Sequence, residues 1–324
     1  MKRRKFLRIA ALSPVAAAIL NPLNLVKGQI PPGGRPPQGM PPGGFQGRNQ
    51  GPTEYVPTGP GIKVKFMGTG SADFRGRPIN DVFRRNASIL VDGKVIFDLT
   101  QTAVDMVPTV NPPQVIFYTH SHDDHYVPKA ALEVGVKRVY LGDSWIDRAR
   151  EDFRKACEET GKPMPEIIPL KEGQSVTEEG LTVTALPANH ASNFVEEQTL
   201  IYLIEKDSAR VLYATDTGGL TARALGFAGA GQFSRDRKFL TGIIMEATMD
   251  ANYAPDQRIF SHSSVDLVAT SVKVLSDNRR YLPVEGQKVY LTHLGRTYPP
   301  QEQIDATLPA PLSAAYDGLE VLFP

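Results

Sequence analysis

The sequence predicts an α/β domain in which two packed β-sheets carry helices on their outer faces. Three observations lead to this prediction. Short β-branched and aromatic runs, typical of buried strands, recur from residue 62 to the C-terminus. Some of these runs follow one another directly, whereas others are separated by stretches with helical periodicity, which is typical of layered sheets. Polar clusters follow several of the runs, where open α/β sheets usually place their sites.

The first strand is expected at residues 62–67, which alternate in polarity. Asp92-Gly93 between two apolar runs predicts a hairpin of residues 88–91 and 94–97. The apolar run 115–118 predicts a buried strand, and Pro128, a residue favoured at helix starts, precedes a helical pattern. Further strands are expected at 138–141, 181–186, 200–205, 211–214, 242–245 and 288–291, with helices at 129–134, 144–160 and 263–276.

The N-terminal segment has the features of an export signal. Arg3 and Arg4 begin a basic stretch, and the apolar residues 9–20 follow it. The apolar stretch is short and interrupted by Pro14, so it does not predict a stable membrane span. We interpret residues 1–28 as a twin-arginine signal peptide, which predicts a periplasmic or secreted protein. The alternative is a basic amphipathic anchor.

Residues 29–61 form a segment of a different composition, since more than half of them are Pro or Gly. Such a segment has little to bury and predicts a disordered or extended linker. A functional role in attachment to an envelope component is the alternative. The folded domain is therefore assigned to residues 62–324.

Charge and cysteine content exclude some classes of function. The chain has 36 basic and 35 acidic residues, and residues 1–28 hold six of the basic ones and no acid. The remainder therefore has a net charge of −5, which does not favour binding to a long polyanion, and no nucleic-acid partner is expected. Cys157 is the only cysteine, so an intrachain disulfide and a cysteine-ligated zinc cluster are excluded.

The strongest chemical signal is the hexapeptide at residues 120–125, His-Ser-His-Asp-Asp-His, directly after the expected strand 115–118. Imidazole and carboxylate groups together suit Zn²⁺ or another borderline divalent metal. The alternative is a polar loop that happens to be rich in histidine. However, the other three histidines, His190, His262 and His293, also lie in short loops after strand-like runs. This placement indicates that all six histidines build one site.

The pattern His120-x-His122-x-Asp124-His125, followed by His190, Asp216 and His293, resembles the metallo-β-lactamase superfamily of metal-dependent hydrolases. The resemblance implies a four-layer αβ/βα sandwich with metals along one edge. It also implies two divalent ions, zinc in the first place with Mn²⁺ or Fe²⁺ as alternatives, which share a hydroxide. By this resemblance the first ion is held by His120, His122 and His190, the second by Asp124, His125 and His293, and both by Asp216.

Two further motifs resemble the RNase Z branch of this superfamily, whose relatives include cyclic phosphodiesterases and exported arylsulfatases. They are Glu246-Ala247-Thr248 and His262-Ser263-Ser264. The resemblance implies that His262 is a general acid oriented by Glu246, so Asp124, His262 and Glu246 are the expected catalytic residues. The alternative for His262 is a residue at a helix N-terminus beside a capping serine.

Two departures argue against a tRNA substrate. Only 25 residues separate His190 from Asp216, too few for the long arm of tRNA-processing members, and Met245 stands where a His usually precedes Glu246.

We therefore expect an exported dinuclear phosphodiesterase that acts on a small or cyclic phosphodiester. The alternatives are an arylsulfatase or lactonase of the same fold, and a non-catalytic metal-binding envelope protein. The expected partner is a small-molecule substrate, and a homodimer is compatible with the sequence.

Overall fold

The computed structural model describes residues 52–324 except residues 75, 80, 232–233, 235–236 and 255. The predicted signal peptide, and the predicted linker as far as residue 51, lie outside the described residues. Residues 52–61 form no helix or strand. Tyr55 among them is nevertheless buried, and its hydroxyl donates a hydrogen bond to the carbonyl oxygen of Pro324 at 2.6 Å. Within the described ranges, no helix has the length and hydrophobicity that a membrane span requires.

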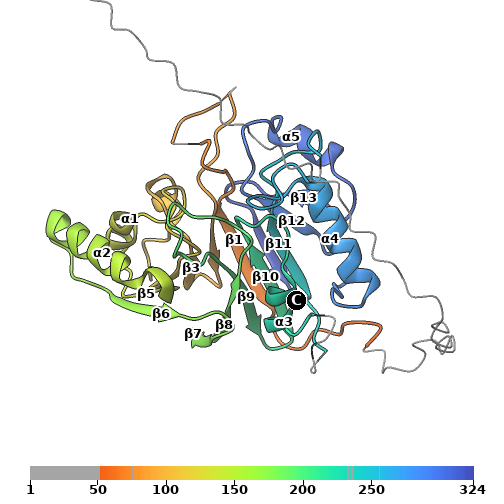
Figure 1. The fold of residues 1–324 in the computed structure, drawn as a ribbon, viewed down its shortest axis with the longest axis horizontal. Coiled ribbons are helices and arrows are strands. Elements are labelled where there is room, and N and C mark those ends of the chain that lie inside the picture. Colours follow the sequence, from red (N-terminus) through yellow and green to blue (C-terminus); the bar gives the residue numbers. More distant parts are fainter. Residues whose placement is uncertain (1–51, 75, 80, 232–233, 235–236, 255) are drawn as a thin grey trace, which may run out of the picture. The chain divides into compact units, whose positions relative to one another are not determined.

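Two seven-stranded mixed sheets form the centre of the domain (Figure 1). The first sheet has the order β14-β1-β2-β3-β4-β5-β6. Its strands are β1 (Ile62–Gly68), β2 (Ser88–Val91), β3 (Val95–Phe97), β4 (Val115–Phe117), β5 (Arg138–Gly142), β6 (Glu166–Leu170) and β14 (Glu320–Phe323). The second sheet has the order β13-β12-β11-β10-β9-β8-β7. Its strands are β7 (Ser175–Glu178), β8 (Leu181–Pro187), β9 (Leu200–Lys206), β10 (Ala209–Ala214), β11 (Gly242–Glu246), β12 (Val289–Thr292) and β13 (Leu312–Ala314).

Helices cover the outer face of each sheet, as Figure 1 shows for α1 and α2 on one side and α4 on the other. The α-helices are α1 (Pro128–Val134), α2 (Ile146–Thr160), α3 (Ala222–Phe227), α4 (Val265–Asp277) and α5 (Gln301–Ile304). Short 3₁₀ segments are η1 (Gln101–Met106), η2 (Asp143–Trp145) and η3 (Asp305–Thr307). The helix expected from residue 144 therefore begins as a 3₁₀ turn and continues as α2.

Strand periodicity explains the layers. In β4, Phe117 points between the sheets and stacks on Phe97 with ring centroids 5.2 Å apart, whereas Ile116 points outward to the cluster under α1 and α2. Successive side chains of a strand face opposite sides, so one strand serves two apolar layers. On the second sheet, Ile243 likewise packs under α4 while its neighbour Ile244 faces the inter-sheet core. The predicted four-layer αβ/βα sandwich is confirmed.

The strand directions bring several loops to one edge. In the second sheet β10, β11 and β12 are parallel, and β8 has the same direction because β9 is antiparallel to both β8 and β10. At this edge β9 is joined to the first sheet, since Leu200 N donates to Thr119 O at 2.9 Å and the Tyr202 hydroxyl donates to Tyr118 O at 2.6 Å. The segment that follows β4 is thereby held beside the loops that follow β8, β10, β11 and β12.

Candidate active site

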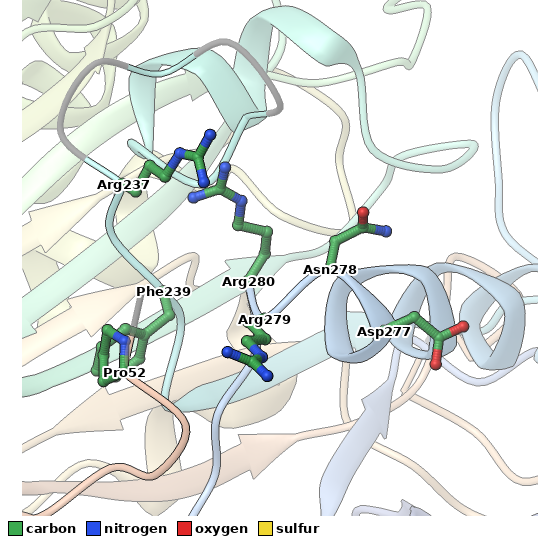
Figure 2. Close-up of a pocket in the computed structure, with 7 residues that line it drawn as sticks. All are labelled: Pro52, Arg237, Phe239, Asp277, Asn278, Arg279 and Arg280. Carbon is green, nitrogen blue, oxygen red and sulfur yellow. The ribbon is translucent and has the colours of Figure 1, made fainter. Parts of the chain in front are cut away.

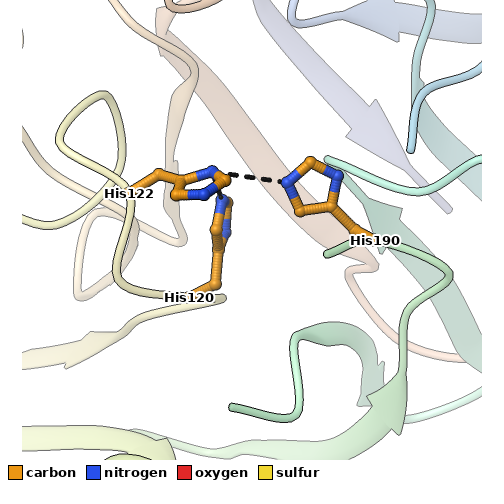
Figure 3. A group of neighbouring side chains, drawn as sticks. All are labelled: His120, His122 and His190. Carbon is orange, nitrogen blue, oxygen red and sulfur yellow. Dashed lines mark hydrogen bonds between the residues drawn. The ribbon is translucent and has the colours of Figure 1, made fainter. Parts of the chain in front are cut away.

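All six histidines converge at this edge of the two sheets. The first group consists of His120 and His122, from the loop after β4, and His190, from the loop after β8 (Figure 3). His120 Nε2 lies 2.9 Å from His122 Nδ1, and His190 Nε2 lies 3.3 Å from the same nitrogen. Three ring nitrogens that face one another at such distances could hold a single cation.

The second group consists of Asp124, His125 and His293, the last of which follows β12. Asp124 Oδ2 lies 3.3 Å from His125 Nε2 and 3.2 Å from His293 Nε2. His125 is completely buried, and its Nε2 has no hydrogen-bond partner among the described residues. A buried nitrogen without a hydrogen bond, next to a carboxylate, is the arrangement that a metal ion would complete.

Asp216 lies between the two groups. Its Oδ2 is 2.8 Å from His125 Nε2 and 3.3 Å from His293 Nε2, and its Oδ1 is 3.7 Å from His190 Nε2. The carboxylate therefore offers one oxygen to each group, which is the position required of a bridging ligand. Asp216 and His293 both adopt left-handed backbone conformations, with φ of 48° and 53°. Such conformations cost free energy in residues other than Gly and are found at functional sites.

The distal nitrogens of four histidines are held by fixed partners, which leaves each Nε2 directed at the centre. His190 Nδ1 donates to the Ser261 carbonyl oxygen at 2.7 Å, and this contact sets the tautomer. The other three contacts join His120 Nδ1 to Thr119 Oγ1 at 3.0 Å, His125 Nδ1 to Asp98 Oδ2 at 2.9 Å, and His293 Nδ1 to Thr248 Oγ1 at 2.8 Å. A set of imidazole nitrogens and carboxylate oxygens oriented in this way fits borderline divalent ions.

The electrostatics favour the protonation state of a metal ligand at His120 and Asp216, whereas at His125 the carboxylates of Asp216, Asp124 and Asp98 outweigh burial and raise the pKa well above its usual value. Burial lowers the pKa of His120 well below its usual value, so this imidazole is held neutral. Burial alone would raise the pKa of Asp216, but the imidazoles of His293 and His125 hold that pKa well below its usual range. The carboxylate between the two groups is therefore ionised.

Asp98 supports the histidine loop. Its carboxylate is fully buried, accepts hydrogen bonds from Thr119 N at 2.8 Å and from Thr119 Oγ1, and contacts His125 Nδ1. Burial raises the pKa of Asp98 despite these contacts. Asp98 thus fixes both the start of the histidine loop and the orientation of one of its rings.

His262 and Glu246 form a pair beside the metal-ligand groups. His262 Nδ1 lies 3.1 Å from both carboxylate oxygens of Glu246, and Glu246 Oε1 also accepts a hydrogen bond from Thr217 N at 2.5 Å. The His262 ring lies 4.9 Å from that of His190 and 5.5 Å from that of His293, between centroids. Burial lowers the pKa of His262, but the Glu246 carboxylate outweighs this and raises the pKa of His262 to about 9.

The capping alternative for His262 does not agree with the structure. The N-cap of α4 is Ser264, whose hydroxyl accepts a hydrogen bond from Leu267 N at 3.2 Å, so His262 precedes the helix. Ser263 instead donates to the Thr217 carbonyl oxygen at 2.6 Å and so joins this segment to the loop that carries Asp216. Because Nδ1 of His262 is engaged by Glu246, Nε2 is the atom that can transfer a proton.

Glu197 is a residue of this region that the sequence did not indicate. Its buried carboxylate accepts hydrogen bonds from Ser121 N at 2.7 Å, Ser121 Oγ at 2.6 Å and Ser192 Oγ at 3.0 Å, and pairs with Arg148 of α2 at 2.8 Å. One side chain thereby joins the histidine loop to the loop that follows His190. A lone Glu in an irregular loop has no sequence signature that would have identified it.

Glu197→Ala is expected to lower the free energy of unfolding by about 3 kcal/mol, because it leaves the Ser121 backbone N–H and the mostly buried Arg148 guanidinium without an acceptor. Urea denaturation would measure the loss. Glu196→Ala is the matched control, since that neighbouring side chain is exposed and should change stability by less than about 0.5 kcal/mol. Equal effects of the two substitutions would contradict the role assigned to Glu197.

Comparisons with known proteins agree with this architecture. Residues 95–233 match the family model described as Beta-lactamase superfamily domain, a span that includes six of the seven predicted metal ligands but not His293. The fold is similar to that of the metallo-β-lactamase fold protein YhfI from Bacillus subtilis, at 16% identity and a TM-score of 0.55, over 80% of this chain and 99% of that one. A search of curated proteins with the sequence gives no match.

Two other solved structures have a fold similar to that of this chain. Human tRNase Z, short form, is 19% identical with a TM-score of 0.55, over 81% of this chain and 99% of that one. Zn²⁺-bound PqqB from Methylobacterium extorquens is 14% identical with a TM-score of 0.58, over 80% of this chain and 99% of that one. At these identities the comparisons establish the fold.

Proposed function

Because the chain has the metallo-β-lactamase fold and gathers imidazoles and carboxylates at one edge of it, we propose that it is a hydrolase with two divalent metal ions that cleaves a small or cyclic phosphodiester. The observation that carries the phosphodiester assignment is the His262–Glu246 pair beside the ligand groups. An alkoxide leaving group needs a proton, and a histidine oriented by a carboxylate is suited to supply one.

His120, His122 and His190 would hold one ion, Asp124, His125 and His293 the other, and Asp216 would contact both. When bound, two such ions lower the pKa of water and stabilise negative charge on the phosphoryl oxygens. The chain's own contribution is positional. Thr119, Asp98, Thr248 and the Ser261 carbonyl fix the rings, so that little reorganisation is needed when the ligands are engaged.

In the proposed reaction water adds to phosphorus, the bond from phosphorus to the leaving oxygen breaks, and a monoester and an alcohol result. His262 donates its Nε2 proton to the leaving oxygen as that bond breaks. Glu246 holds the imidazole through Nδ1 and stabilises its protonated form. After the transfer, His262 is neutral and recovers a proton from solvent or from the attacking water.

A substrate comparison tests the assignment. Purified protein should hydrolyse bis-p-nitrophenyl phosphate faster than an aryl sulfate or a lactone, the substrates of the two alternative activities of this fold. Faster lactone hydrolysis would replace the phosphodiesterase assignment by acyl hydrolysis, which requires no separate general acid. No turnover of all three by metal-loaded protein would favour a non-catalytic metal-binding protein.

The protein as purified is expected to contain about two metal ions per chain, with zinc as the expected ion. His293→Ala should reduce this to about one, because it removes a ligand of the second group and leaves the first group intact. Elemental analysis after gentle purification measures both values. One ion in the unmodified protein, with no change in His293→Ala, would contradict the dinuclear assignment.

Export is part of the proposal and depends on the N-terminal sequence. Replacing Arg3 and Arg4 by Lys is expected to retain the protein in the cytoplasm, since paired arginines are recognised by a receptor and not by charge alone. Cell fractionation of the two forms measures the effect. Replacement of the nearby Lys2 and Lys5 by Arg preserves the pair and serves as the control; unchanged export of the Lys-Lys form would mean that another route is used.

A further inference from the structure

The backbone that carries His262 belongs to no helix or strand. Residues 258–262, which we call the His262 turn, lie between β11 and α4. Within the turn, the N–H groups of Ser261 and His262 both donate to the Arg258 carbonyl oxygen, at 2.7 and 2.8 Å. These bonds give the turn its shape but do not attach it to the rest of the site. Its position relative to the metal-ligand loops therefore depends on contacts with those loops.

Asn189 bonds to the His262 turn and to the loop after β10 at once. Its Nδ2 donates to the Ile259 carbonyl oxygen and to the Gly218 carbonyl oxygen, both at 2.7 Å. Its own carbonyl oxygen accepts from Gly218 N at 2.9 Å, and its N–H donates to Thr217 Oγ1 at 2.9 Å. One residue therefore joins three segments that are far apart in the sequence.

The side-chain partners of Asn189 require an amide. Both are carbonyl oxygens, which can only accept, and the two N–H donors of one amide group match them. An ionised carboxylate of the same shape would face two carbonyl oxygens without a proton to donate. The substitution Asn189→Asp therefore replaces two attractive contacts by two repulsive ones and changes almost no volume.

Gly218 allows the His262 turn to come this close to the loop that carries Asp216. A Cβ atom at Gly218 would lie 1.9 Å from the Ile259 carbonyl oxygen and 2.9 Å from Ser261 N, far inside van der Waals contact. Because these are main-chain atoms, no side-chain rotation would relieve the overlap. Any side chain at this position would push the turn away from the neighbouring carboxylate ligand.

Other contacts hold the chain nearer to His262 and beyond it. His190 Nδ1 donates to the Ser261 carbonyl oxygen at 2.7 Å, and Ser263 Oγ donates to the Thr217 carbonyl oxygen at 2.6 Å. Asn189 holds the turn at Ile259, three residues before His262. The Asn189 contact therefore fixes the entry of the turn, and the other two fix its exit.

We propose that Asn189 is a positioning residue for His262, which it places relative to the metal ligands by holding the His262 turn against Gly218. The inference rests on the proposed function, in which His262 protonates the leaving oxygen. Glu246 engages the ring of His262 through Nδ1 and so sets its direction, whereas Asn189 sets where the backbone of the turn lies. A displacement of about 1 Å is enough to lower the rate of a step by about 100-fold.

Kinetics of Asn189→Ala and Asn189→Asp in the metal-loaded, full-length protein test the proposal. Each substitution should lower kcat for an alkyl phosphodiester by about 10- to 100-fold. The loss with a p-nitrophenyl diester should be less than about threefold, because only the alkoxide needs the proton of His262. Asn189→Asp should be impaired at least as much as Asn189→Ala, since it adds repulsion. Both variants should retain the metal content of the unmodified protein, because Asn189 is not a ligand.

A double-mutant cycle separates positioning from a general loss of stability. On the alkyl diester, Asn189→Ala/His262→Ala should be as slow as His262→Ala alone, to within about twofold, because no imidazole is left to position. If the two losses instead multiplied, Asn189 would act by another route and the proposal would be overturned.

Gly218→Ala should show the same dependence on the leaving group as Asn189→Ala, because its Cβ would displace the His262 turn from the other side of the contact. Gly226→Ala is the control, since a Cβ at Gly226 would have no atom within 4 Å. A Gly218→Ala variant that folds and keeps the turnover ratio of the two substrates unchanged would contradict the inferred contact.

Asn278 is the matched control for Asn189. Its Nδ2 also donates to a main-chain carbonyl oxygen, that of Val274, at 2.7 Å. It follows the last residue of α4 and lines a pocket there with Phe239 and others (Figure 2). A helix of this length places it about 20 Å from the end of α4 that His262 precedes. Asn278→Ala should leave the turnover ratio unchanged, and an equal shift of the ratio in both variants would overturn the proposal.

Hydrogen exchange measures the position of the turn without catalysis. In Asn189→Ala the amides of Ser261 and His262 should exchange about tenfold faster than in the unmodified protein, because the turn loses its contact at Ile259. The amides of α4 should be unchanged, since Ser264 still caps that helix. If the unmodified protein hydrolysed neither diester, the proposed function would fail and exchange alone would decide the role of Asn189. Unchanged exchange in the turn, or faster exchange throughout the domain, would overturn the inference.

Discussion

His262→Ala is expected to lower turnover of an alkyl phosphodiester by about 10²- to 10⁴-fold while both metal ions stay bound. The reason is that Nδ1 of this ring is held by Glu246, which leaves Nε2 to protonate a leaving oxygen that departs poorly as an alkoxide. The same variant should lose much less activity with a p-nitrophenyl ester, because p-nitrophenolate departs without a proton. Steady-state kinetics on both substrates, with metal analysis of the variant, measure the difference.

Glu246→Gln should give a weaker form of the same dependence on the leaving group, since the imidazole remains but loses its charged partner. Equal losses on both substrates in His262→Ala would remove the general-acid role. Loss of metal in that variant would instead identify His262 as a ligand. This outcome is tested because His262 Nδ1 lies 3.6 Å from Asp216 Oδ1, one of the expected ligand atoms.

Asp124→Asn is expected to remove metal from the second group and to lower turnover by about 10³-fold or more. A bound metal ion contributes several kcal/mol of stabilisation to the negative charge of the transition state, and this contribution is lost with the ion. Asp124 is buried and contacts both His125 and His293. An amide has the same shape but lacks the negative charge that holds a cation there. Activity at saturating substrate and metal content by elemental analysis provide the two readouts.

The adjacent Asp123 is the control for this substitution. It belongs to the same hexapeptide, but its side chain is exposed and is in none of the groups of candidate metal ligands. Asp123→Asn should therefore leave metal content, activity and stability close to those of the unmodified protein. If the two substitutions had equal effects, the separation of the hexapeptide into ligands and a solvent-exposed linker residue would be wrong.

The central strands and the ligand loops could be predicted from the sequence because their signals are local. The runs at 115–118 and 242–245 are apolar on both faces, and the structure has β4 and β11 there with every residue buried. Six histidines in loops after such runs could only come together if the strands ended at one edge. The topology confirms that they do.

The outer strands were not predicted because their signals are weak. β7 is half exposed at the edge of its sheet, and β6 contains Pro169, a residue compatible with an edge strand but not indicative of one. β13 and β14 are short. β14 pairs with β1, at the other end of the domain's sequence, and β13 pairs with β12 across the intervening α5. Local periodicity therefore does not identify them.

The site contains a residue that no local pattern could have predicted. Glu197 acts through contacts with Ser121, 76 residues away, and Arg148, 49 residues away. Sequence patterns identify which side chains can bind an ion, whereas the contacts that orient those side chains come from packing between distant segments.

Because hydrogen bonds join β9 to the segment after β4, the two sheets are held together, and metal affinity should depend on their staying together. The histidine loop belongs to one sheet and His190, Asp216 and His293 to the other, so neither half of the molecule contains a complete set of ligands. Ions bound across this junction stabilise only the assembled pair of sheets. A substitution deep between the sheets, such as at Phe117, that favours their separation should therefore weaken metal retention without touching a ligand. Chelation should in turn loosen the contact between the sheets before either sheet loses its own strands.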